Sequence, residues 1–406
     1  MTLKQAYPFV LAVLATIPGI ALRFMHPEIS PLVMASLTGM AILGASFMLM
    51  WACDVAQMDI PQTLALAVVA LIAVLPEYAV DMYFTWMAGQ HPESDYAHYA
   101  IANMTGANRL LIGIGWSLIA LLHVFRFGKS VFLEEERRSE LLFLAMATVY
   151  ALFISLKGSL VWYDGVILVS MYIWYIRIAS QRPCTECEVE GPAEVLATLP
   201  QTTRRLTTLG LFFFAAGVIL CDAELFSESL VASGTILGIN EFLLVQWLAP
   251  VASEAPEFIV AIMFALRGHA SLALGSLISS KLNQWTLLVG MIPGVYALSS
   301  GSINPPMPLD AHQMHEILLT AAQSLFAVVL LTRMQLGLKG ALTLLVLFVA
   351  QFAAPFYAPM IEQLFGITLI YDGMHLAFSA IYIALAIFLA IRFPSRLLAL
   401  RHGFTV

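Results

Sequence analysis

Two stretches of the chain carry the same pattern: A-V-L-P-E-Y-A-V-D-M-Y-F at residues 73–84 and S-E-A-P-E-F-I-V-A-I-M-F at residues 253–264. A Pro-Glu pair stands inside each, with Glu77 in the first stretch and Glu257 in the second, and the apolar residues that follow also match. Both stretches lie in long apolar runs, where a carboxylate is costly and therefore indicates function. An internal repeat thus places one matched glutamate in each of two apolar helices.

A polar motif follows each stretch. It reads A-N-M-T-G-A-N-R-L-L-I-G at residues 102–113 and G-S-L-I-S-S-K-L-N-Q-W-T at residues 275–286. An alignment of the two motifs without gaps pairs Asn108 with Lys281, and the first repeat then has the longer loop, near residues 89–97. The repeat therefore extends over two consecutive helices in each half of the chain.

The composition of the chain indicates that these helices lie in a membrane. Of 406 residues, 60% are apolar and 11% are charged, whereas about a quarter are charged in ordinary soluble domains. The hydrophobicity excludes a soluble globule and a disordered chain, and the net charge of −7 excludes a nucleic-acid partner. The apolar runs are about 20 residues long, which is the length of a membrane-spanning helix and too long for a barrel strand.

These runs predict an all-α polytopic membrane protein with about twelve transmembrane helices. The predicted spans are 7–25, 31–53, 61–88, 97–124, 139–156, 159–180, 206–222, 237–266, 270–298, 311–332, 338–353 and 371–392. The two Pro-Glu helices are five spans apart, so they cross the membrane in opposite directions. The pattern predicts two inverted-topology repeats of five helices with one extra helix at each end, and transporters place their sites at the interface of such repeats.

The repeat divides the chain into predicted parts. They are an extra N-terminal helix at 1–30, a first repeat at 31–180, a cytoplasmic loop at 181–205, a second repeat at 206–353, and an extra C-terminal helix with a basic tail at 354–406. The loop contains Cys184 and Cys187, which lack the further ligands of a structural zinc site. The role of this cysteine pair stays open.

The basic residues orient the chain. Cytoplasmic N- and C-termini place fifteen of the 19 Lys and Arg residues on the cytoplasmic side, as the positive-inside rule requires, and leave Arg23 and Lys157 outside. No basic residue falls in the predicted outer loops at 89–97, 223–236 and 299–310. We therefore predict an integral protein of the plasma (inner) membrane. The two other basic residues, Arg109 and Lys281, fall inside predicted spans.

The repeats supply the residue types of a cation site. A proline before each glutamate removes a helix hydrogen bond and frees carbonyls near Ile72 and Ala252. Carboxylates and carbonyls suit Ca²⁺ or Na⁺, and each carboxylate can exchange the metal ion for a proton. The predicted ion-binding residues share helix faces: Glu77 with Asp81, Ser253 and Glu254 with Glu257, and a stripe of Ser276, Ser280 and Gln284.

These motifs resemble the calcium/cation antiporter superfamily, whose Na⁺/Ca²⁺ exchangers carry two inverted repeats built on G-(S/T)-S-x-P-E and G-N-x-x-G-S-N-x-F-N. The resemblance covers residues 31–180 and 206–353 and indicates a divergent member. It implies that Glu77 and Glu257 coordinate the transported metal ion. It also implies that hydroxyls and amides complete the ion sites, at Ser253, Ser280, Asn103 and Asn108.

Departures from the superfamily pattern alter the charge of the predicted site. Residues without polar side chains replace several family ligands in the first repeat: Ala73, Val74, Ala107 and Leu111. Asp81 and Glu254 are additional acids. Together with Glu77 and Glu257 they give four negative charges. Arg109 and Lys281 add two positive charges, so the net charge of these six side chains is −2, the same as for the two glutamates of the family. We interpret the basic pair as charge-compensating groups in places that bound Na⁺ would otherwise fill.

The sequence thus predicts a secondary active cation antiporter that works by alternating access, exchanges Ca²⁺ or another small cation for H⁺ or Na⁺, and needs no cofactor. Its predicted partners are the lipid bilayer and small inorganic cations, with no nucleic acid; protein partners stay unknown. Two alternatives are a non-transporting homologue and an intramembrane metal-dependent enzyme that uses His312, His315 and Glu316. The spacing of these three residues is not that of the zinc motif H-E-x-x-H, and Asp310 before them is typical of a helix N-cap.

Overall fold

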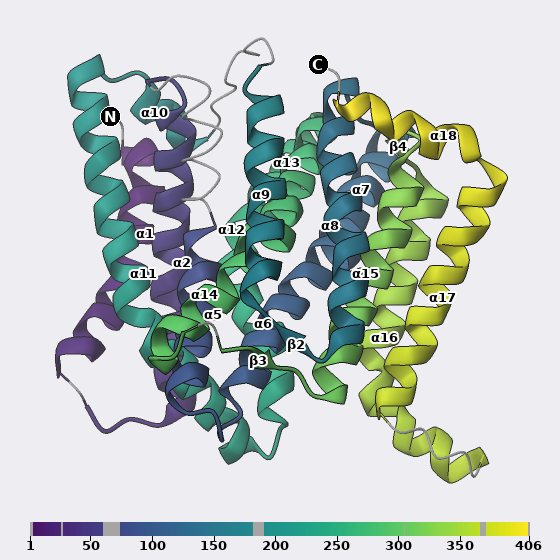
Figure 1. Cartoon of the computed structure of the whole chain (residues 1–406). Helices are drawn as coiled ribbons and strands as arrows, with labels where there is room; N and C mark the ends of the chain where they lie inside the picture. The colour runs from purple at the N-terminus through teal and green to yellow at the C-terminus, as the bar shows by residue number, and fades with distance from the viewer. Residues whose placement is uncertain are drawn as a thin grey trace. The chain divides into compact units, whose positions relative to one another are not determined.

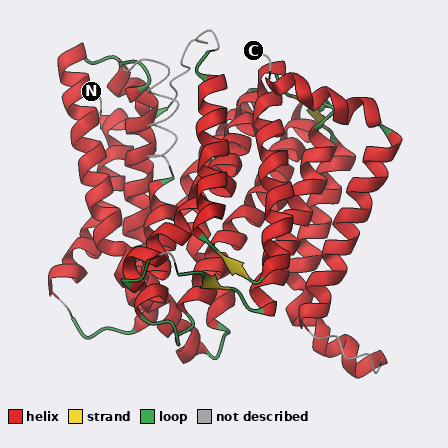
Figure 2. Ribbon diagram, viewed as in Figure 1, coloured by secondary structure: helices red, strands yellow, loops and turns green. Residues whose placement is uncertain are grey.

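The computed structural model describes residues 3–25, 27–59, 74–181, 191–303, 305–365 and 371–404. Helices dominate these residues (Figures 1 and 2). A helix lies at every predicted span that falls within them, and nine of the described helices are long and apolar enough to cross a membrane. The start of the third predicted span, with Ile72 and Ala73, and the pair Cys184 and Cys187 lie outside the described residues.

The first of two compact units holds residues 1–103 and 179–257. Its helices are α1 (Leu3–Met25), α2 (Pro31–Ala56), α5 (Leu75–Gln90), α10 (Pro192–Ala197) and α11 (Gln201–Leu237), with the start of α6 (Tyr96–Leu110) and most of α12 (Glu241–Arg267). Within this unit α1, α2 and α5 all pack against α11. This packing brings the N-terminal helix, which we predicted as an addition, into the core of the unit.

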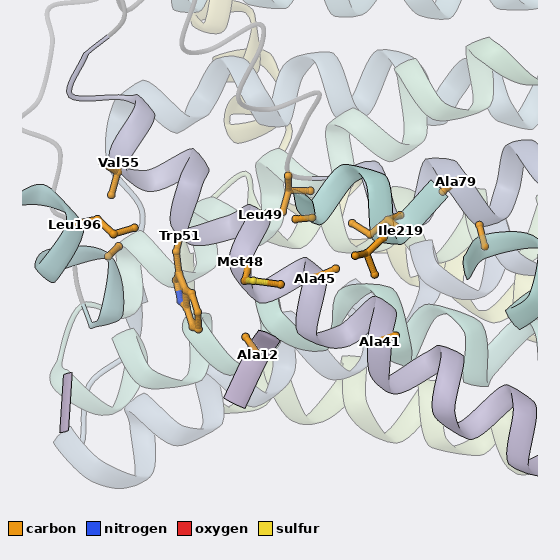
Figure 3. Close-up of a cluster of buried hydrophobic side chains, with 14 residues drawn as sticks. Ala12, Ala41, Ala45, Met48, Leu49, Trp51, Val55, Ala79, Leu196 and Ile219 are labelled. Carbon is orange, nitrogen blue, oxygen red and sulfur yellow. The ribbon is translucent and has the colours of Figure 1, made fainter. Parts of the chain in front are cut away.

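Small residues allow the helices of the first unit to approach closely. A buried apolar cluster joins α1, α2 and α11 and contains Ala12, Ala41, Ala45 and Ile219 (Figure 3). A Cβ atom built on Gly44 would lie 2.7 Å from the carbonyl oxygen of Ala12, so only glycine permits this contact. Such contacts between small residues are the usual means by which membrane helices associate.

Helix α11 corrects one prediction. We expected a span at 206–222 followed by an outer loop at 223–236, whereas the structure has a single helix of 37 residues. Its last part is helical because it has a buried apolar face, which includes Phe226 and Leu230, and because its acids are paired. Those pairs are Arg23 with Glu224 at 2.6 Å, and the hydroxyls of Tyr83 and Tyr96, which both donate to Glu228 at 2.5 Å.

The second unit holds residues 104–178 and 258–406. Besides the ends of α6 and α12 it contains the π-helix η2 (Leu111–Trp116), α7 (Ser117–Phe127), the 3₁₀-helix η3 (Glu135–Arg137), α8 (Arg138–Lys157), α9 (Trp162–Ala179) and α13 (Ala270–Asn283). After these come the π-helix η4 (Gln284–Leu288), α14 (Val289–Ser300), α15 (Ala311–Leu331), α16 (Leu338–Phe365), α17 (Tyr371–Arg392), α18 (Pro394–Ala399) and the 3₁₀-helix η5 (Leu400–Phe404). Helix α16 extends well beyond the predicted span 338–353 because its apolar sequence continues.

Four short strands tie the two repeats together within the second unit. β1 (Val131–Phe132) and β2 (Ser159–Leu160) flank α8, and β3 (Met307–Pro308) and β4 (Gln335–Leu336) flank α15. The pairing is crossed and antiparallel: β1 pairs with β4, and β2 pairs with β3. Elements of one repeat therefore pair with the opposite elements of the other, as expected for inverted repeats. At the start of α15, Asp310 forms the predicted N-cap by accepting a 2.8 Å hydrogen bond from the backbone N–H of Gln313.

Candidate ion-binding site

Helix α5 begins at the first Pro-Glu motif. Pro76 stands in its first turn, where a missing N–H costs nothing, and Glu77 follows with 3% of its surface exposed. One turn later Asp81 is fully buried and accepts a 3.0 Å hydrogen bond from the amide of Asn103 on α6. The structure thus brings together two predicted site residues from the two consecutive helices of the first repeat.

Helix α12 carries the second Pro-Glu motif in its interior. Pro250 and Pro256 both lie inside this helix and leave carbonyls without their usual partners. Glu254 is fully buried, whereas Glu257 is only partly buried.

The donor set determines what a cation could find here. Among the residues that the structure describes, no group of three His, Cys, Asp or Glu side chains is placed to hold a metal ion. A cation at these acids would therefore be held by one or two carboxylates together with neutral oxygens from carbonyls, hydroxyls and amides. Hard cations such as Ca²⁺ accept such mixed oxygen ligands.

In the second unit, Lys281 contacts Asn108. Both side chains are fully buried, and the ammonium group of Lys281 donates to the Asn108 side-chain oxygen at 2.7 Å and to its backbone carbonyl at 3.2 Å. It also lies 4.4 Å from the ring centre of Trp285. These are the two positions that the sequence repeat aligns with each other. Equivalent residues that touch in this way are expected close to an axis that relates two repeats.

The polar motifs of both repeats end in a π-helix. η2 begins at Leu111, three residues after Asn108, and η4 begins at Gln284, three residues after Lys281. Ser280 and Gln284, which we predicted to bind ions, are both buried in the second motif. Because π-helical turns are rare and are frequent at functional sites, their presence at matched positions supports the predicted location of the site.

Arg109 has a partner that the charge count omitted. Its guanidinium donates to Glu316 of α15 at 2.5 Å, and both side chains are almost completely buried. The imidazole of His375 on α17 lies 2.9 Å from the other oxygen of Glu316. The charge-compensating role of Arg109 stays a prediction, and the acid that it contacts here lies outside the motifs. The rule that singled out Arg109, a charge inside an apolar span, would also have selected Glu316.

The same contacts bear on the alternative metal enzyme. Glu316 is engaged by Arg109 and His375, and the ring of His312 packs edge-on against that of His375, with centroids 5.6 Å apart. No group of three potential ligands forms a metal site among the described residues, so His312, His315 and Glu316 do not assemble one.

Comparison with known proteins identifies the family and the fold. The sequence model of the family described as sodium/calcium exchanger protein matches residues 29–181 and 207–357. A crystal structure of the H⁺/Ca²⁺ exchanger CAX is 41% identical to this chain, with a TM-score of 0.90, and the match covers 99% of this chain and 98% of the exchanger.

More distant relatives share the fold. The sodium-calcium exchanger NCX_Mj is 17% identical, with a TM-score of 0.51 over 85% of this chain and 99% of the exchanger. The membrane protein MJ0091 of Methanocaldococcus jannaschii is 24% identical over 61% of this chain and 72% of its own length. At such identities the likeness concerns the architecture alone.

Proposed function

The chain belongs to the sodium/calcium exchanger family and is a cation antiporter, and we propose that it exchanges Ca²⁺ for H⁺. The observation that carries this proposal is the 41% identity to an H⁺/Ca²⁺ exchanger over nearly the whole chain. It is supported by the replacement of several hydroxyl and amide positions of the Na⁺ exchangers by apolar residues, such as Val74, Ala107 and Leu111.

In this proposal Glu77 and Glu257 are the groups that bind either the metal ion or protons. A pair of carboxylates can hold one divalent cation, and protonation of both releases the cation while the total charge of the occupied site is unchanged. Ser253, Asn103, Asn108, Ser280 and Gln284 would add neutral oxygens. Asp81 is bound by Asn103, and its role would be to fix that amide.

The proposal includes the organisation of the chain. The repeats would be residues 31–180 and 206–353, with the extra helices at 1–30 and 354–406. The protein would lie in the plasma membrane with cytoplasmic termini, as the distribution of basic residues indicates. It would need no cofactor and would act on no covalent bond, since the family consists of exchangers.

Flux in sealed vesicles tests the proposal. In vesicles that contain the purified protein and a pH-sensitive dye, an inward Ca²⁺ gradient without Na⁺ should drive proton efflux and raise the internal pH. Glu77→Gln and Glu257→Gln should abolish this signal. Glu135→Gln is the matched control, because its carboxylate is 73% exposed and lies in η3 before α8, where it pairs with Arg138, so this variant should transport normally.

If the antiport is coupled to Na⁺ instead, the opposite result is expected in the same vesicles. A Ca²⁺ flux that appears only when Na⁺ is supplied on the other side, with no change of internal pH, would contradict proton exchange. Absence of any Ca²⁺ flux under both conditions, with a correctly folded protein, would favour a non-transporting homologue.

A further inference from the structure

A buried acid outside the repeat motifs lies on α11 of the first unit. Asp222 has no exposed surface, and neither of its carboxylate oxygens has a hydrogen-bond partner among the described residues. Burial of an ionised carboxylate without a partner costs several kcal/mol, whereas the protonated acid is far less costly to bury. The packed arrangement therefore accommodates Asp222 as the neutral acid.

The space that Asp222 occupies exists because α1 has a glycine there. A Cβ atom built on Gly19 would overlap Oδ2 of Asp222 and would lie 2.5 Å from the Cβ atom of Ala41 on α2. The buried hydroxyls one turn away on these two helices, Thr16 and Thr38, donate to carbonyls of their own helices at 2.7 and 2.8 Å. Asp222 is thus enclosed by apolar atoms at the contact of three helices.

Few charges surround this contact. The titratable groups on this part of α11 and on the helices that pack against it are Arg23 of α1, Asp81 and Tyr83 of α5, and Cys221, Glu224 and Glu228 of α11 itself. Those of α2 and α10, which are Cys53, Asp54 and Glu194, lie towards the other end of α11. Arg23 of α1 is the cation at this end of the contact, where it binds Glu224 of α11. It lies one turn from Gly19 on the same face of α1.

Arg23 has a second possible partner in Asp222. It now binds Glu224 at 2.6 Å, in an ion pair whose side chains are 36% and 49% exposed. Glu224 is two residues from Asp222 on α11, and residues two apart on a helix do not face each other, so the long Arg23 side chain would have to move across the surface of α11 to pass from one carboxylate to the other. Glu224 would then be solvated by water, which its exposure permits.

We propose that Asp222 is a proton-binding site, separate from the acids of the exchange site, whose occupancy is coupled to the contact between α1 and α11. With the proton bound, the Asp222 carboxyl is neutral, α1 packs against it through Gly19, and Arg23 binds Glu224. When the proton leaves to water at the exposed Arg23–Glu224 rim, Arg23 moves to the ionised Asp222. The external proton concentration thereby determines whether Arg23 of α1 binds Glu224 or Asp222 of α11.

Infrared difference spectroscopy of the membrane-embedded protein during a pH titration tests this site directly. The C=O stretch of a protonated carboxyl should be present in the wild type and missing in Asp222→Asn, which has nearly the same shape. Two variants that keep Asp222 should move its titration in opposite directions. Glu224→Gln frees Arg23, so the band should disappear at a lower pH. Arg23→Gln removes the partner of the ionised form, so the band should persist to a higher pH.

Glu228→Gln is the matched control, because Glu228 lies one turn beyond Glu224 and is bound by Tyr83 and Tyr96. It should leave the titration of the band unchanged. The proposal is overturned if no carboxyl band depends on Asp222, or if the band titrates at the same pH in the Arg23 and Glu224 variants as in the wild type. These readouts do not use transport, so failure of this site and failure of Ca²⁺/H⁺ exchange are distinguishable.

Discussion

The helix that carries the polar motif has the same backbone form in both repeats but a different arrangement of charges. In the first repeat α6 passes through the π-helix η2 into α7, and in the second repeat α13 passes through η4 into α14. In the first, Arg109 is neutralised by a carboxylate, that of Glu316 on α15. In the second, Lys281 donates to neutral oxygens of Asn108 in the opposite repeat.

The difference shows that backbone geometry is retained between the repeats where side-chain chemistry has diverged. The sequence presents two intramembrane cations at adjacent aligned positions, but they have different surroundings. Arg109 belongs to a buried ion pair with a helix outside the motifs, and Lys281 joins the two motifs to each other. Two of the four measurements below test the surroundings of Arg109 and Lys281 directly, and the other two test the packing and an ion pair elsewhere in the protein.

Removal of one member of the ion pair should have the largest effect. Arg109→Met should lower the free energy of unfolding by about 3–5 kcal/mol, because it leaves the carboxylate of Glu316 buried without its cation. Denaturant titration in detergent micelles measures this loss. The double variant Arg109→Met/Glu316→Met should recover most of it. A loss below about 1 kcal/mol in the single variant would show that the pair does not carry the charge balance assigned to it.

The packing around one glycine of each repeat, in η2 and in α14, should have the next largest effect. A Cβ atom on Gly113 in η2 would overlap the side chain of Phe348, so Gly113→Ala should destabilise the protein by about 2 kcal/mol through overpacking. Gly294 in α14 of the other repeat has no atom within 4 Å of such a Cβ atom. Gly294→Ala should therefore be neutral or slightly stabilising. Equal effects in the same unfolding assay would contradict the packing difference.

The contact between the motifs should have a moderate energy. A double-mutant cycle with Lys281→Met and Asn108→Ala should give a coupling of about 1.5 kcal/mol, near the upper end for hydrogen bonds inside membranes. Thr343 serves as the reference, because it is half-buried on α16 and its hydroxyl donates to the carbonyl of Lys339 in its own helix. A cycle of Lys281→Met with Thr343→Ala should give a coupling near zero. Similar couplings in both cycles would mean that the contact between the repeats is not specific.

The smallest effect should come from the ion pair between Asp59, which follows α2, and Arg204 in the first turn of α11. Hydrogen bonds from Arg204, supported by its charge and by Arg205, hold the pKa of Asp59 at about 2, compared with 3.8 for the unperturbed group. A lowered pKa in the folded state means that this stabilisation is present above about pH 4 and is lost as the pH falls towards 2. Asp59→Asn should remove less than about 1 kcal/mol at neutral pH, and its stability should depend less on acid than that of the wild type. An unchanged acid profile would contradict the pairing.

Much of the fold follows from the sequence because the bilayer imposes simple constraints. Apolar runs of spanning length, the Pro-Glu repeat and the aligned polar motifs predicted the helical membrane fold, the inverted repeats and the family. The comparisons confirm the fold class and the family. The alignment also predicted that Asn108 and Lys281 are equivalent, and the structure places them in contact. The assignment of the ion-binding residues stays a prediction.

Tertiary structure alone decided which charges meet. The acids of α11 suggested a loop because their partners, Arg23, Tyr83 and Tyr96, are more than a hundred residues away in the sequence. Glu316 lies 207 positions from Arg109, and the glycine that encloses Asp222 lies on the N-terminal helix. Hydropathy reports the cost of placing a charge in a membrane, but the compensation for that cost depends on which helices pack together. The sequence therefore determined where charges enter the membrane, and the packing of the helices determined how each of them is stabilised.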